Sequence, residues 1–242
     1  MTRAPAAGRW LTLLLVGLGI ALTIGGPLFG RGVFLGTDLL ERFDPWASTA
    51  PDFGEPDNYL RGDEVDVRTP ARHQIAQGLR ELDLPLWQSE VNGGRPLGSV
   101  PNTSSLSPFN APYWILPIAY APAATKLLEL LVAMLGTFAL LRGHGVRKDV
   151  SVLGGFLVAF SGYQIVWTAA PVAPLAAMFP AMLWSVDLAL RRRTFLAHLP
   201  LLLAVTTGWL QGFPALSVLQ LVLAGAWSVF SLVGTRPVRS MV

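Results

Sequence analysis

The sequence predicts an all-α polytopic membrane protein with about six transmembrane helices and a long extracytoplasmic first loop that carries short interfacial helices. Of the 242 residues, 52% are hydrophobic and only 14% are charged, and the mean hydropathy is +0.49. Ordinary soluble domains carry roughly 25% charged residues, so this chain lacks the polar surface that water requires. Apolar runs near the 20-residue length of a spanning helix alternate with short basic clusters.

Cysteine is absent from the chain. This excludes a disulfide framework, a thiolate metal site and a cysteine nucleophile. The formal charge of +3 and the pI of about 9.7 raise the question of nucleic-acid binding, which depends on where the basic residues lie.

The first predicted domain, residues 1–30, is an N-terminal transmembrane helix. Its apolar run extends from Trp10 to Phe29 after two arginines, which also resembles a secretory signal peptide. However, no small-x-small cleavage site follows, and the run is long for a signal peptide. We therefore expect a retained membrane anchor.

The second predicted domain is an extracytoplasmic loop, residues 31–111, and the third is a transmembrane bundle, residues 112–242. Prolines interrupt residues 109–122 every four or five positions, which favours an interfacial or re-entrant segment over a span. The spans that follow are predicted at about 123–141, 150–169, 174–190, 195–210 and 214–233.

The charges fix the expected orientation. Six crossings place ten basic residues on one side, which the positive-inside rule assigns to the cytoplasm. The loop of residues 31–111 holds twelve acidic residues and seven arginines, and lies outside. The prediction is a multi-pass plasma (inner) membrane protein with both termini cytoplasmic, and no nucleic-acid binding. The ten residues are Arg3, Arg9, Arg142, Arg147, Lys148, Arg191, Arg192, Arg193, Arg236 and Arg239.

Two short helices are predicted within the loop. Apolar residues recur at helical spacing over 38–46, which predicts a helix lying on the membrane. A second helix over 69–81 begins with Thr69 as N-cap and Pro70 at the first helical position, and an apolar stripe then continues to Glu81. Arg72 and His73 fall on its first turns.

Asp38 is the first candidate for chemistry. It follows the first span by eight residues, so its carboxylate is expected near the outer membrane surface, within reach of a lipid phosphate or a substrate hydroxyl. An N-cap of the short helix explains the same residue. Glu41 and Asp44 could join Asp38 in holding a divalent cation through oxygen ligands, or the three could form a plain polar face.

A second patch suits phosphate recognition. The adjacent glycines Gly93 and Gly94 allow backbone amides to approach an anion, and Arg95 supplies charge; a simple turn explains them equally. Lys126 and Glu129, three residues apart near the outer end of the second span, form either an internal ion pair, which we favour, or donor-binding groups.

These residues carry a resemblance. An Asp soon after the first span, Leu-Pro-Leu-Trp at 84–87, Gly-Gly-x-Pro-Leu at 93–97, Asn102 and Ser-Pro-Phe at 107–109 resemble the N-terminal region of YfhO-type bacterial membrane proteins, of the GT-C class of polytopic glycosyltransferases. The likeness continues at 159–163, 180–184 and 212–214. Two departures are an acidic insertion around 52–66 and Gln88-Ser89, where the family usually has Asn-Pro. Family members are much longer, so the chain resembles an N-terminal portion or a truncated relative.

The resemblance implies transfer of a sugar from a polyprenyl-phosphate donor to a cell-envelope acceptor on the outer face of the membrane. Asp38 matches the family's catalytic Asp, which acts as general base or organises the acceptor; Arg95, with Arg72 or His73, would neutralise the leaving phosphate. The sequence indicates no cofactor beyond a divalent cation at Asp38, Glu41 and Asp44. The substrate-binding candidates are Asp44, Arg72, His73, Trp87, Gly93, Gly94, Arg95 and Asn102.

Two other functions fit the same sequence. A transporter or flippase of lipid-linked glycans fits six spans with intramembrane prolines and glycines, but the chain has neither an evident inverted repeat nor a series of buried charges. A non-catalytic membrane assembly subunit would use the acidic loop to dock a partner.

Overall fold

The computed structural model describes residues 14–49, 55, 58–84, 86–89, 91, 93–97 and 102–234. Apart from one two-stranded ladder, the regular structure of these residues is helical, which confirms the all-α prediction. The outermost residues of both termini and part of the acidic insertion lie outside the described residues, so the predicted basic termini, Arg3, Arg9, Arg236 and Arg239, do too.

Four described helices are long and apolar enough to cross a membrane: α6 (Ala121–Gly143), the segment Lys148–Val166, α9 (Val172–Arg192) and, within α11 (Pro214–Gly234), Pro214–Val233. The remaining two predicted spans are shorter apolar helices, Leu14–Leu28 and α10 (Phe195–Leu210). The described chain therefore has four candidate spans, not six. α10 ends early because Gln211 and Gly212 turn the chain, with a φ of 73° at Gly212.

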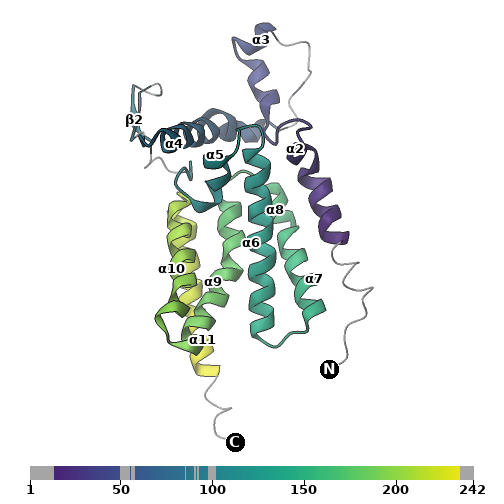
Figure 1. The fold of residues 1–242 in the computed structure, drawn as a ribbon, viewed down its shortest axis with the longest axis vertical. Helices are drawn as coiled ribbons and strands as arrows, with labels where there is room; N and C mark the ends of the chain where they lie inside the picture. The colour runs from purple at the N-terminus through teal and green to yellow at the C-terminus, as the bar shows by residue number, and fades with distance from the viewer. Residues whose placement is uncertain are drawn as a thin grey trace, which may run out of the picture.

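The bundle is organised around α6. Figure 1 shows α6, α7 (Lys148–Ala159), α9, α10 and α11 running side by side, with α6 packed on both α7 and α9. The segment after α7 breaks at Phe160, and α8 (Gly162–Val166) restarts with Ser161 as its N-cap. The first helix contains the π-helical turn η1 (Ala21–Gly25) and ends in α2 (Gly26–Leu28).

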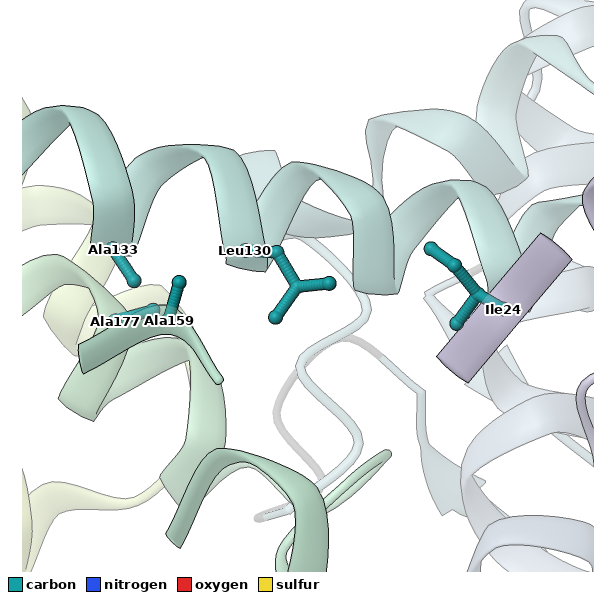
Figure 2. Close-up of a cluster of buried hydrophobic side chains, with 5 residues drawn as sticks. All are labelled: Ile24, Leu130, Ala133, Ala159 and Ala177. Carbon is teal, nitrogen blue, oxygen red and sulfur yellow. The ribbon is translucent and has the colours of Figure 1, made fainter. Parts of the chain in front are cut away.

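Small apolar residues form the core of the bundle. One cluster joins the first helix to α6, α7 and α9, and Figure 2 shows Leu130 between Ile24 on one side and three alanines on the other: Ala133, Ala159 and Ala177. Alanine at these contacts lets helix backbones approach closely, which is the usual packing between membrane helices.

Part of the segment between the first helix and α6 forms a cap over one end of the bundle. We define the cap as the described part of residues 58–115. It contains η3 (Tyr59–Arg61), η4 (Glu64–Arg68), α4 (Thr69–Glu81), β1 (Trp87–Gln88), β2 (Arg95–Pro96), η5 (Pro108–Asn110) and α5 (Ala111–Ile115). In Figure 1, α4 lies across the end of the bundle, above α10 and α9.

The predicted helix over 38–46 is wrong in form. The structure has a 3-10 turn, η2 (Thr37–Arg42), then extended backbone at Phe43 and a separate short helix, α3 (Trp46–Thr49). Because the turn stops at Arg42, the apolar residues do not share one face: Leu39 is buried, whereas Phe43 and Trp46 are exposed. Figure 1 places α3 beyond α4, on the far side from the bundle, and not at the bundle's edge where a membrane surface would lie.

The helix predicted over 69–81 is confirmed at both bounds, but the predicted N-cap is wrong. α4 spans Thr69–Glu81 and ends at Leu82 in the left-handed conformation. Thr69 is not an N-cap, because the chain is already helical from Gly62 through η4. The proline-rich segment 109–122 forms η5, α5 and a turn at Pro117 before α6 begins.

Candidate functional site

A buried polar cluster lies where the cap meets the bundle. We use "polar cluster" for five side chains, each at most 4% exposed: Glu64 from η4, Arg72 from α4, Tyr113 from α5, and Lys126 and Glu129 from α6. Charged residues are almost never buried this fully unless they are paired. The pairings therefore determine what the cluster can do.

Arg72 is held by the cap itself. Its Nη1 donates to Glu64 Oε1 at 2.7 Å and its Nε donates to the Thr103 carbonyl at 3.0 Å. The guanidinium also lies 5.5 Å from the centre of the Tyr113 ring, a cation–π contact. Burial alone would lower the pKa of Arg72, but the Glu64 carboxylate, Tyr113 and the Glu129 carboxylate together outweigh burial, and the pKa is raised. Arg72 is therefore a permanently charged, fully engaged part of the cap.

Lys126 and Glu129 form the other half of the polar cluster. Lys126 Nζ donates to Glu129 Oε2 at 3.0 Å and to the Gln164 carbonyl at 2.6 Å. This confirms the internal ion pair that the spacing favours. The Gln164 bond also ties α6 to α8, just after the break in the third apolar segment.

A small cavity adjoins both pairs. Its lining includes all five of the cluster's side chains together with Phe34, Thr125 and residues of the α8–α9 turn. The space open to the centre of a water molecule is only about 20 Å³, and about 10–15 Å³ suffices for one water. A sugar ring does not fit into this cavity as it stands.

Asp38 does not line this cavity. It is half-buried in η2, which packs against η4, the turn that carries Glu64. Asp44 is exposed and Glu41 is half-buried. Within the described residues, no three His, Asp or Glu side chains are grouped closely enough to hold a metal ion, so the cation site at Asp38, Glu41 and Asp44 has no support from geometry.

The Leu-Pro-Leu-Trp motif at 84–87 and the Gly-Gly-x-Pro-Leu motif at 93–97 contribute to one β-hairpin. β1 and β2 pair antiparallel, with Trp87 opposite Pro96 and Gln88 opposite Arg95. Arg95 Nε donates to Gln88 Oε1 at 2.8 Å, and a Cβ at Gly94 would lie 2.6 Å from the Trp87 ring. Gly94 has a φ of 108° and Gly93 one of 74°. The motifs thus build a hairpin whose Arg95 is already engaged and which is separate from the polar cluster.

The hairpin is fixed to α4 by a small apolar core. Leu97, which follows β2, is fully buried against Ala71 and Ile75 of α4. His73 is half-buried on the same helix and does not line the cavity. Of the predicted binding residues, the structure brings Arg72 alone into the polar cluster.

Asn102 serves a different contact. Its backbone N–H donates to the Gly212 carbonyl at 3.0 Å, which joins the cap to the turn between α10 and α11. Beside it, the Ser104 hydroxyl donates to the Gln211 carbonyl at 2.8 Å, and the Ser107 hydroxyl donates to Gln211 Oε1 at 2.6 Å. These buried hydrogen bonds fasten the cap to the turn between α10 and α11.

The opposite end of the bundle has its own buried acid. Asp187 Oδ2 lies 2.8 Å from His144 Nε2, and its Oδ1 accepts from Trp227 Nε1 at 3.0 Å and from Ser231 at 3.3 Å. Arg191 lies 3.6 Å away. The contacts connect α9 with α11 and with the residue that follows α6, so Asp187 lies close to the arginine triplet but is engaged mainly by other helices.

Glu64, Tyr113 and Gln211 were not predicted. A signal for Glu64 exists, because Glu64, Arg68 and Arg72 are spaced i, i+4 and i+8 and would share one face of a helix that began before Thr69. No comparable signal marks Tyr113 or Gln211, whose burial depends on contacts between distant segments.

Comparisons of the chain with family models, with curated proteins and with solved structures found no match.

Proposed function

We propose that the chain is a plasma-membrane protein with six crossings whose cap, on the outer face, takes part in transferring a sugar from a polyprenyl-phosphate donor to a cell-envelope acceptor. The four long apolar helices support a multi-pass membrane protein. The finer topology rests on the basic clusters, and the activity rests on the resemblance of the cap motifs to the YfhO-type family.

One structural observation carries the proposal beyond the resemblance. The long polar region is a folded cap on one end of the bundle, and Asp38 is half-buried in a turn packed against it. A carboxylate held against the cap in this way supports a role at the headgroup of a membrane lipid. An exposed loop would not position it.

The proposed chemistry needs a base and a cation. Asp38 would take the proton of the acceptor hydroxyl as its oxygen attacks the anomeric carbon, and the bond from that carbon to the phosphate oxygen would break. The phosphate leaves with the bonding electron pair. Arg95 is the candidate to neutralise it, because Arg95 is half-buried, although its Nε is bonded to Gln88, whereas Arg72 is fully buried between Glu64 and Thr103.

The test compares two carboxylates of the outer region. Asp38→Asn should abolish glycan transfer by the reconstituted protein while leaving its level in the membrane unchanged. Asp83→Asn, at an exposed position just after α4, should leave transfer at the wild-type rate. Full transfer by the Asp38 variant would remove Asp38 as the base, and movement of donor between leaflets without a new glycosidic bond would indicate a flippase.

A second candidate function is a non-catalytic assembly subunit. The observation that favours it is the closed polar cluster, whose charges are paired with each other and whose cavity is too small for a sugar ring. In that case, the chain purified from its native membrane should migrate as a larger complex than the chain produced alone, and Asp38→Asn should change neither the complex nor the glycan.

A further inference from the structure

The cavity beside the polar cluster is lined by polar atoms that make no hydrogen bond of good geometry to any described residue. Among the described residues, three such atoms belong to buried side chains that line it: Glu64 Oε2, Tyr113 Oη and Thr125 Oγ1. They come from η4, α5 and α6, so three separate elements converge on one space. Glu64 Oε2 lies 3.5 Å from an Arg68 guanidinium nitrogen, which is an ion pair but too long for a good hydrogen bond.

The behaviour of Thr125 is informative. Other buried hydroxyls on the membrane helices donate to the carbonyl four residues back, as Thr137 does to Ala133 and Ser185 to Ala181, both at 2.7 Å. Thr125 makes no such bond to any described residue. A buried hydroxyl without a partner is costly, so its orientation toward the cavity implies that something there accepts or donates the bond.

Charge and size define the occupant. The two acids and two cations of the polar cluster balance one another, so an added ion would leave an uncompensated buried charge. The space of about 20 Å³ admits one water-sized group. The lining offers a carboxylate acceptor and two hydroxyls, which suits a group that both donates and accepts.

We propose that this cavity is a binding site for one hydroxyl group, supplied by a water molecule or by the hydroxyl of a sugar or other alcohol. The bound hydroxyl donates to Glu64 Oε2 and exchanges hydrogen bonds with Tyr113 and Thr125. It thereby joins the cap to the bundle. Burial raises the pKa of Tyr113, which keeps its phenol protonated and able to donate. The proposal does not depend on the chain transferring a sugar.

Isosteric substitutions give opposite signs for an occupied and an empty site. Thr125→Val removes the hydroxyl and keeps the shape of the side chain. If a hydroxyl is bound, the Tm of the purified protein in detergent should fall by about 2–4 °C, the shift expected for one lost buried hydrogen bond in a chain of this size. If the cavity is dry, the variant removes an unsatisfied group and the Tm should stay or rise, which would overturn the proposal.

Two further variants guard against a general loss of stability. Thr137→Val, on the same helix, removes a hydroxyl that bonds within the helix and should change the Tm by less than the Thr125 variant. Tyr113→Phe should also lower the Tm, and combining it with Thr125→Val should cost less than the two shifts added, because both lose the same bound group. Additive shifts would contradict a shared occupant.

A high-resolution map of the wild-type protein identifies the source. A single isolated peak between the three side chains means water, and density that continues into a larger molecule means a bound alcohol or sugar. Either result supports the site. An empty or collapsed cavity in that map would overturn it.

Discussion

The buried ion pair Lys126–Glu129 illustrates how the stability of this protein depends on the pairing of its buried charges. Each side chain is 3% exposed and the two lie 3.0 Å apart. A buried charge that loses its partner is left unsolvated, whereas losing both charges together costs much less. Lys126→Met should therefore lower the free energy of unfolding by about 3–5 kcal/mol, measured by thermal or denaturant unfolding in detergent.

The double variant Lys126→Met with Glu129→Leu should recover most of that loss. Recovery stays incomplete, because the Gln164 carbonyl loses the donor that Lys126 supplies at 2.6 Å. A double variant less stable than the single one would show that Glu129 is stabilised by something other than Lys126.

Asp187 applies the same rule at the other end of the bundle. Asp187→Ala removes a 5%-exposed carboxylate that accepts bonds from α11 and from His144, and should destabilise the protein by at least about 2 kcal/mol. Asp149→Ala removes a carboxylate paired with Arg147 in an exposed ion pair, and should cost less than about 1 kcal/mol. Similar losses in the two variants would mean that the Asp187 contacts do not persist in solution.

Contacts between side chains can be predicted from the sequence where the two residues lie close together along the chain. Lys126 and Glu129 are three apart on one helix, so the sequence alone predicts that they meet. Tyr113 reaches Arg72 from 41 positions along the chain, and nothing in the local pattern around Tyr113 indicates it. The site combines one local pair with one non-local assembly, which is why the sequence predicts only part of it.

The hairpin is the element that explains the most specific motifs. Trp87 packs on Gly94, where a Cβ would lie 2.6 Å from its ring, whereas a Cβ at Gly93 would meet nothing within 4 Å. Both glycines have positive φ, so alanine at either costs about 1–2 kcal/mol of backbone strain. Gly94→Ala should destabilise the cap further than Gly93→Ala, seen as faster limited proteolysis between β1 and η5. Equal rates would contradict the packing of Trp87 on Gly94.

The contact of α6 with α9 depends on one glycine. A Cβ at Gly136 would lie 2.8 Å from the Ala181 backbone nitrogen, so Gly136→Ala should separate the two helices and cost about 1–3 kcal/mol of stability. Gly225 on α11 has open space where a Cβ would lie, so Gly225→Ala should stabilise by up to about 1 kcal/mol through helix propensity. Unfolding in detergent measures both, and a stabilising Gly136 variant would refute the close contact.

Element boundaries follow the same division between local and distant causes. The end of α4 at Glu81 agrees with the end of its apolar stripe, which the sequence shows directly. The start of α4 at Thr69 agrees as well, but the helical segment begins earlier than the sequence indicates, because η4 extends it upstream and brings Glu64 within hydrogen-bond distance of Arg72. The contacts that Glu64 of η4 makes within the polar cluster outweigh the local capping signal at Thr69 and Pro70.

At the scale of the molecule, the number of crossings depends on whether the short apolar helix α10 spans the membrane. α10 has 16 residues, about 24 Å of helix against a hydrocarbon core of about 30 Å. Short helices are accommodated by local thinning and by flanking residues that reach the interface. Arg191 to Arg193 precede α10 and the half-exposed Trp209 lies near its other end, which are the anchors that a short crossing requires.

Single introduced cysteines decide between these topologies, because the chain has no thiol of its own. With six crossings, an impermeant maleimide should label Asp83→Cys in right-side-out vesicles. It should label Lys148→Cys, Thr194→Cys and Val233→Cys only after the membrane is opened. These four positions are exposed in the structure. If α10 does not cross, α11 runs in the opposite direction through the membrane and Val233→Cys becomes accessible from outside while Thr194→Cys stays protected. That pattern would contradict six crossings. It would also place the turn at Gly212 on the inner side of the membrane, although its carbonyl accepts a hydrogen bond from Asn102 of the cap, and the proposed function needs the cap on the outer face.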